Sequence, residues 1–185
     1  MRSFSFSYFP ELLVNQFLLR RLSVADAESV FTLRSNTAIL RYLHREPAQS
    51  VEEVLAFIQS INRAFDENES VLWGISPADE PQKCIGTVCF WNIRKENFRA
   101  ELGYMLHPDY WRKGIMKTIL PAVIDYGFSK MHLHSIDAVV DSANEPSARL
   151  LEHLGFTREA YFKEDLYYKG QFYNTCVYSL LNNTR

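Results

Sequence analysis

The segment AELGYMLHPDYWRKGIMKTILPAVIDYGF, residues 100–128, organises the chain as a strand, a tight loop and a helix. Its apolar start ends after Leu106, because Pro108 has no amide hydrogen to donate to a sheet. Beyond the loop, apolar residues recur at helical spacing: Ile115, Met116, Ile119, Leu120, Val123, Ile124, Phe128 and Met131. This spacing predicts a helix with one buried face, and Pro121 inside it predicts a kink.

The loop before this helix has the features of an anion site. Gly114 lets the backbone approach a ligand closely, and the amides that follow it lie at the positive end of the helix dipole. Arg112, Lys113 and Lys117 add positive charge at the same place. These features favour a bound phosphate or pyrophosphate over the alternative, in which the basic side chains are merely solvated.

The composition is that of an ordinary globular protein. A length of 185 residues predicts a single domain over residues 1–185. Hydrophobic residues make up 47% of the chain and charged residues 23%, which argues against disorder. A net charge of -2 argues against a general nucleic-acid binder, so no direct nucleic-acid binding is expected and any basic site must be local.

The sequence predicts a cytoplasmic protein. The N-terminal MRSFSFSYFP is broken by serines and lacks the apolar core of a signal peptide. No apolar stretch reaches the length of a membrane span, so no membrane partner is expected. Cys84, Cys89 and Cys176 form no CxxC pair, which fits reduced thiols.

Hydrophobic periodicity, capping residues and turn residues predict the order of elements. Helices are expected over residues 23–34, 51–65, 115–131 and 144–155, with a short helical piece over 37–43. Strands are expected over residues 16–22, 71–76, 83–92, 98–106, 135–140, 157–167 and 172–181. The strands on either side of the turn at residues 94–97 must be antiparallel, because that turn is short.

Several common kinds of site are excluded. The sequence has no GxGxxG, no GxxxxGK[ST], no GxSxG and no HExxH. His132 and His134 are two residues apart and would share a face in a strand, but the sequence offers no further metal ligands nearby, so surface histidines are favoured and no metal is expected. The anion site at Gly114 is the strongest chemical feature of the sequence.

Three segments resemble the GNAT superfamily of acetyl-CoA-dependent N-acetyltransferases. Trp111–Met116, WRKGIM, is similar to its cofactor-loop signature Gln/Arg-x-x-Gly-x-Gly/Ala. The leading Trp is common in the RimJ/RimL branch, which acetylates the N-termini of ribosomal proteins. Phe9–Leu43 resembles the opening strand and helices of that branch, and Asn144–Phe156, NEPSARLLEHLGF, resembles its Asn-x-x-Ser helix. The resemblance covers nearly the whole chain.

The resemblance implies an α/β (α+β) fold. In it, a central mixed, mostly antiparallel sheet of about seven strands is flanked by four helices.

The resemblance also implies roles for particular residues. Backbone amides of the loop would hold the pyrophosphate of coenzyme A, the strand edge near Met105 and Leu106 would pair with its pantetheine, and Asn144 would contact the cofactor arm. The loop residues are Arg112, Lys113, Gly114, Ile115, Met116 and Lys117. Glu101 occupies the position of a candidate general base, and Ser147 that of a hydroxyl that protonates the leaving sulfur.

Two positions depart from the family pattern. Met116 replaces the small residue at the end of the cofactor loop, where it either crowds the phosphates or faces the core. Leu151 replaces a tyrosine that many members carry. A general acid would then be Ser147 or one of the tail tyrosines: Tyr161, Tyr167 and Tyr168.

By resemblance, the protein is expected to acetylate a primary amine with acetyl-CoA as donor. The expected acceptor is a protein N-terminus, with a ribosomal protein as one possibility. Its recognition would come from Arg41, Tyr42, His44 and the final hairpin. Two alternatives stay open: a small amine (polyamine, amino-acid derivative or aminoglycoside) as acceptor, and a non-catalytic module that binds acyl-CoA. A monomer and a homodimer are both compatible with the sequence.

Overall fold

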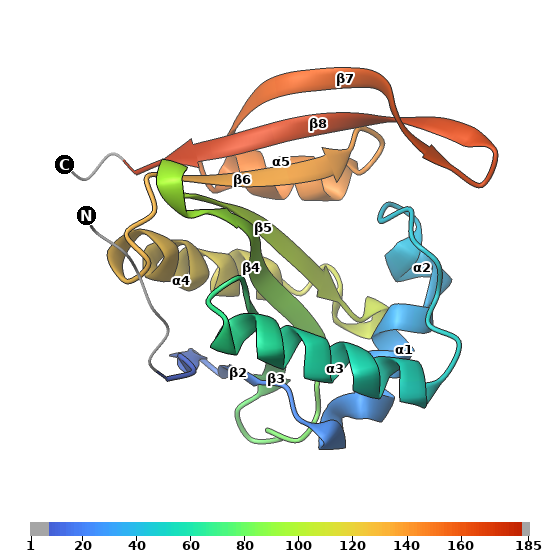
Figure 1. The fold of residues 1–185 in the computed structure, drawn as a ribbon, viewed down its shortest axis with the longest axis vertical. Helices are drawn as coiled ribbons and strands as arrows, with labels where there is room; N and C mark the ends of the chain where they lie inside the picture. The colour runs from blue at the N-terminus through green and yellow to red at the C-terminus, as the bar shows by residue number, and fades with distance from the viewer. Residues whose placement is uncertain (1–7, 183–185) are drawn as a thin grey trace.

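The computed structural model describes residues 8–182 as one eight-stranded sheet with helices on both faces (Figure 1). The elements are β1 (Leu12–Val14), β2 (Phe17–Arg21), α1 (Ala27–Ser35), α2 (Thr37–Leu40), α3 (Val51–Asp66), β3 (Val71–Pro77), β4 (Gly86–Arg94), β5 (Arg99–Leu106), α4 (Ile115–Ser129), β6 (Ser135–Asp141), α5 (Glu145–His153), β7 (Thr157–Tyr168) and β8 (Gln171–Leu181). The predicted order of elements is confirmed.

Two details differ from the sequence prediction. A short additional strand, β1, forms a hairpin with β2 through Asn15, whose φ of 51° lies in the left-handed region. The helix expected from residue 23 begins with a 3₁₀ turn, Val24–Asp26, before α1. The opening segment, which is not expected to be a signal peptide, lies outside the described residues except for residues 8–10.

The sheet is mixed, as expected, because one neighbouring pair is parallel. Its order is β1-β2-β3-β4-β5-β6-β8-β7. β5 and β6 run parallel, and every other neighbouring pair is antiparallel. A parallel pair needs a crossover connection, which α4 supplies between β5 and β6.

The two faces of the sheet bury separate apolar clusters. One cluster joins β2 to β6 with α4 and with Leu151 of α5. The other joins α1 and α3 over the opposite face, where Val54 and Ile58 of α3 are buried. In Figure 1, α3 lies in front of the sheet, whereas α4 and α5 lie behind it.

The helix α4 fixes the end of β5 relative to the core. Ile115, Met116 and Ile119 are buried in the cluster beneath it. The Met116 side chain therefore faces the core, which answers the question raised by its departure from the family pattern. Pro121 lies on the exposed side of α4, and the helix continues through it to Ser129.

No helix within residues 8–182 is long and apolar enough to cross a membrane.

Candidate active site

The strands β5 and β6 pair only at their beginnings and then separate. Their parallel pairing covers Arg99–Glu101 of β5, whereas β5 stays paired with β4 as far as Leu106. The Asp137 carboxylate of β6 stabilises this paired end, because it accepts hydrogen bonds from Arg94 of β4 and Arg99 of β5 at 2.5–2.6 Å. The rest of β5 therefore presents one edge to a gap in the sheet (Figure 1).

Backbone groups of β5 point into this gap. The His107 amide donates to the carbonyl of Ile85, the residue before β4, at 2.8 Å. Because peptide groups alternate along an antiparallel strand, those of Tyr104 and Leu106 face the other way, toward the gap. The Leu106 carbonyl accepts a hydrogen bond from the Trp111 indole at 2.6 Å instead of from a strand. An extended ligand can pair with such an edge as an added strand does.

Met105, the other residue expected at this edge, is oriented differently. By the same alternation its peptide group faces β4. Its side chain packs against the cluster under α1 and α3.

The loop after β5 has the backbone form that an anion site needs. Arg112 and Gly114 have φ angles of 59° and 75°, both in the left-handed region. A Cβ atom built on Gly114 would meet no atom within 4 Å, so the space in front of this loop is open. The side chains of Arg112, Lys113 and Lys117 are exposed around it.

The first turn of α4 leaves its amides available. Thr118 donates the first intrahelical hydrogen bond, to the Gly114 carbonyl at 3.0 Å. The amides of Ile115, Met116 and Lys117 consequently have no partner in the helix, and the helix dipole makes this end positive. The predicted loop residues therefore fit a pyrophosphate.

Asn144 and Ser147 sit at the start of α5, beside the same gap. The Asn144 side chain caps the helix by accepting from the Ser147 amide at 3.3 Å. That contact uses its carbonyl oxygen and leaves its amide group to donate elsewhere. The Ser147 side chain is buried, and its hydroxyl lies 2.6 Å from the Tyr104 phenol oxygen.

Tyr104 is a candidate functional residue that the sequence reasoning missed. Burial raises the pKa of Tyr104 to about 12, so its phenol is protonated at neutral pH. Alternation along AELGYML was the available signal, since it puts the tyrosine on the strand face shared with Leu102 and Leu106. The tail tyrosines Tyr161 and Tyr167 are about half exposed or more.

Glu101 lies on the other face of β5. It alternates with Leu102 along the strand, so its side chain faces the α1 and α3 side, whereas Tyr104 faces α4 and α5. Its carboxylate accepts a hydrogen bond from the Asn92 side chain at 3.4 Å. Burial raises the pKa of Glu101, helped by the negative charge of Asp137. A carboxylate with a raised pKa is a stronger base than an ordinary one, which suits a group that accepts a proton.

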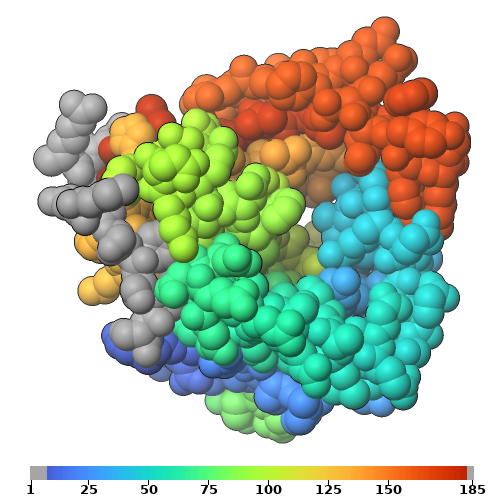
Figure 2. All heavy atoms as spheres, in the orientation of Figure 1, coloured from blue at the N-terminus to red at the C-terminus, as the bar shows by residue number. Residues whose placement is uncertain are grey.

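The residues expected to recognise the acceptor come together at the end of β6. Arg41, Tyr42 and His44 line a hollow of about 370 Å³ with residues 141–143 and residues 172–174. Figure 2 shows the surrounding surface hollowed between α3, the segment around α2, the β4–β5 region and the β7–β8 hairpin.

His44 ties this region to the sheet. Its imidazole contacts the Asp141 carboxylate, and both side chains are only 5% exposed. The ring also lies 3.8 Å from that of Tyr173, measured between centroids. Asp141 itself was not predicted, because the two partners are far apart in the sequence.

The comparison with known families decides the class of this protein. A model of the acetyltransferase (GNAT) domain matches residues 16–157. The chain belongs to the GNAT acetyltransferase family. The predicted fold, the acetyltransferase class and the acetyl donor, acetyl-CoA, are thereby confirmed.

Relatives of this GNAT acetyltransferase differ in their acceptors. It is 36% identical to the uncharacterized N-acetyltransferase YoaA of Bacillus subtilis, over 94% of this chain and 97% of YoaA. The structure of ribosomal-protein-S5-alanine acetyltransferase from Vibrio fischeri is 27% identical, with a TM-score of 0.78 over 95% of this chain and 98% of that one. The structure of spermidine N-acetyltransferase from Vibrio cholerae in complex with CoA and spermine is 25% identical. Its TM-score is 0.79, over 90% of this chain and 95% of that one.

Proposed function

We propose that this GNAT acetyltransferase transfers the acetyl group of acetyl-CoA to the α-amino group of a polypeptide, as a RimJ/RimL-type enzyme. The observation that carries this proposal is the open hollow beside the β5–β6 gap, lined by the segment after α2 and by the β7–β8 hairpin. An open groove suits an extended chain, whereas a small amine is better enclosed by a deep pocket.

The donor would occupy the gap and the loop. The amides from Arg112 to Lys117 would hold the pyrophosphate, and the Leu106 edge of β5 would pair with the pantetheine. Asn144 would donate its side-chain amide to the cofactor arm, whereas the Met105 side chain would lie on the opposite, acceptor face of β5.

Acetyl-CoA supplies an activated acetyl group as a thioester. Glu101 would take a proton from the acceptor ammonium, directly or through water, so that the nitrogen lone pair can form the C–N bond. A β5 amide that faces the gap would donate to the carbonyl oxygen as negative charge develops there. The C–S bond then breaks, the sulfur leaves with its electron pair as a thiolate, and the nitrogen loses its remaining extra proton to solvent, which leaves the neutral amide.

The Ser147 hydroxyl would stabilise the departing sulfur. The Ser147 hydroxyl has one hydrogen, so while it donates to the sulfur it can only accept in its contact with Tyr104. The Tyr104 phenol is placed to donate to Ser147 in that arrangement. A thiol has an ordinary pKa of about 8.5, so full transfer of a proton from a phenol of far higher pKa is uphill. The pair therefore acts as a chain of hydrogen-bond donors.

The acceptor is tested by acetylation of a panel by the purified protein, with product identified by mass spectrometry. We expect acetyl-CoA-dependent acetylation of peptide α-amino groups above that of spermidine and aminoglycosides. Because the chain is similar in sequence to spermidine acetyltransferases, spermidine is the most informative alternative acceptor in this panel. Faster acetylation of spermidine than of every peptide would contradict the proposal. Binding of acetyl-CoA without acetylation of any amine would favour a non-catalytic module.

A further inference from the structure

Arg45 is a partly buried cation without an anionic partner in the described part of the chain. Its Nε atom is buried and unpaired. Its Nη2 atom lies 3.8 Å from the Met105 sulfur, a weak acceptor. Among residues 8–182, no carboxylate lies within salt-bridge distance of Arg45. By contrast, Arg20, which is also partly buried, forms a salt bridge with Asp26.

The surroundings of Arg45 are positive. Burial, together with the nearby charge of Arg34, lowers the pKa of Arg45 to about 10, so it remains charged at neutral pH. The Arg34 guanidinium stacks on the Phe57 ring, 3.8 Å from its centroid. Glu53 is the carboxylate that favours the charge of Arg34. Withdrawing a charge from water without a partner is costly, so this site suits an incoming anion.

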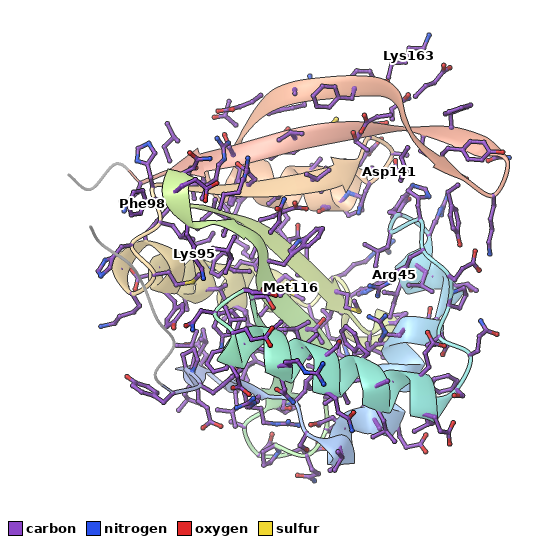
Figure 3. The ribbon with its side chains drawn as sticks, viewed as in Figure 1. Arg45, Lys95, Phe98, Met116, Asp141 and Lys163 are labelled. Carbon is purple, nitrogen blue, oxygen red and sulfur yellow. The ribbon has the colours of Figure 1, made fainter. Side chains whose placement is uncertain are left out.

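The position of Arg45 is held by its neighbour in the sequence. The His44 imidazole contacts the Asp141 carboxylate and the tilted ring of Tyr173, at the junction of α2, β6 and the final hairpin. Arg45 extends from this junction toward β5 (Figure 3). It is therefore a partly buried side chain held beside β5, next to the residue His44 that lines the hollow.

Arg45 and Glu101 lie along the same face of β5. Met105, which Arg45 contacts, and Glu101 have the same parity on the strand, so their side chains share a face. Gly103 lies between them, opposite Cys89 of β4. The Cys89 sulfur lies against Gly103, 3.1 Å from a Cβ atom built on that glycine. Four residues of strand span about 13 Å.

We propose that Arg45 binds a carboxylate of the acceptor, located several bonds from the amine that Glu101 deprotonates. The acceptor is then an N-terminal segment with an acidic side chain at its second or third residue. The span along β5 fits this arrangement, since an extended chain advances about 3.3 Å per residue. In a free amino acid the α-carboxylate is too close to the amine for the amine to reach Glu101 while the α-carboxylate reaches Arg45.

A polyamine fits this face poorly. It would bring further positive charges toward Arg34 and Arg45, and like charges at short range repel. The inference rests on the proposed peptide acceptor and narrows its class.

The test compares three peptides that differ only at one residue, with Glu, Gln or Lys at position two, and repeats the set at position three. Spermidine and free glutamate complete the panel. We expect kcat/KM for the Glu peptide to exceed that for the Gln peptide about tenfold, as a hydrogen-bonded charge pair allows. Arg45→Gln should abolish this preference, and Arg45→Lys should keep part of it. Arg45→Glu should reverse it in favour of the Lys peptide.

Three controls separate recognition from other effects. Arg63→Gln removes an exposed arginine of α3 and should leave the preference unchanged. Thermal unfolding of each variant reports whether it folds. Calorimetry with acetyl-CoA should give the same affinity for Arg45→Gln and the wild type, because Arg45 lies on the acceptor side of β5.

The inference would be overturned by a wild-type enzyme that treats the three peptides alike or prefers spermidine or free glutamate. Weakened acetyl-CoA binding by Arg45→Gln would overturn it too, since Arg45 would then belong to the donor site. If the wild type acetylates no amine at all, the proposed function fails. Calorimetry with the peptides themselves still tests the role of Arg45 in that case, and equal affinities for the Glu and Lys peptides would refute it.

Discussion

The phenol oxygen of Tyr104 lies 2.6 Å from the hydroxyl oxygen of Ser147, within hydrogen-bond distance. One residue comes from the part of β5 that has separated from β6, and the other from the first turn of α5. The contact therefore spans the mouth of the gap in which we place the thioester. Because both side chains are largely buried, the pair keeps a fixed geometry.

Removal of either hydroxyl should slow acetyl transfer. We expect Tyr104→Phe and Ser147→Ala each to lower kcat roughly 10- to 100-fold, which corresponds to a lost hydrogen bond to a charged group. The double variant should lose little more than either single variant, because the two hydroxyls act as one unit. Single-turnover kinetics with one peptide acceptor would measure this, and additive losses would mean that the two act independently.

Glu101→Gln should remove the acid limb of the pH profile of kcat/KM. Burial raises the pKa of Glu101, so in the wild type this limb should lie above pH 4.5, the ordinary value. Below the limb the carboxyl is protonated and cannot accept the proton of the ammonium. Glu96→Gln, in the exposed turn before β5, is the matched control and should leave the profile unchanged. An unchanged limb in Glu101→Gln would exclude Glu101 as the base.

The same substitution should not destabilise the fold. Glu101 has a folded pKa above its unfolded value, so the folded state binds the proton more tightly and stability falls as pH rises through that window. At neutral pH the ionised carboxylate is therefore a net cost, which Gln removes. We expect Glu101→Gln to have an equal or higher melting temperature at pH 7 and a smaller change in melting temperature between pH 4 and pH 7. A clear loss of stability would indicate a structural role.

His44→Ala should affect the acceptor and spare the donor. It removes the buried contact with Asp141 and the ring contact with Tyr173, so the segment that carries Arg45 is released from the sheet. We expect a higher KM for the peptide acceptor with an unchanged dissociation constant for acetyl-CoA. His153→Ala, an exposed histidine of α5, is the control. The reverse pattern would mean that the His44 segment serves the donor site.

The sequence was sufficient for the fold because its signals are local. Apolar spacing in α3 and α4, the Ser50 cap and the Asn144 cap each act within one turn of helix, and each appears in the structure. The strand β1 was missed because it has only three residues, too few for a period to show.

The chemistry of the site was only partly accessible from the sequence. The Gly114 loop is contiguous and could be recognised as an anion site from its own residues. Tyr104 meets Ser147 across 43 residues, and His44 meets Asp141 across 97, so neither contact has a local signal. The unpaired state of Arg45 depends on which carboxylates the fold brings near it, and this too cannot be read from the sequence.

The central claim, a donor site built on the Gly114 loop, is tested most directly by calorimetry with acetyl-CoA on the wild type and on Gly114→Glu. The substitution introduces a carboxylate at the proposed pyrophosphate position. Gly170→Glu is the matched control, because Gly170 has a similar φ of 83°, equally open space and a place in the β7–β8 turn. We expect binding by the wild type and by Gly170→Glu and none by Gly114→Glu. Equal binding by all three proteins, or no binding by the wild type, would contradict the claim.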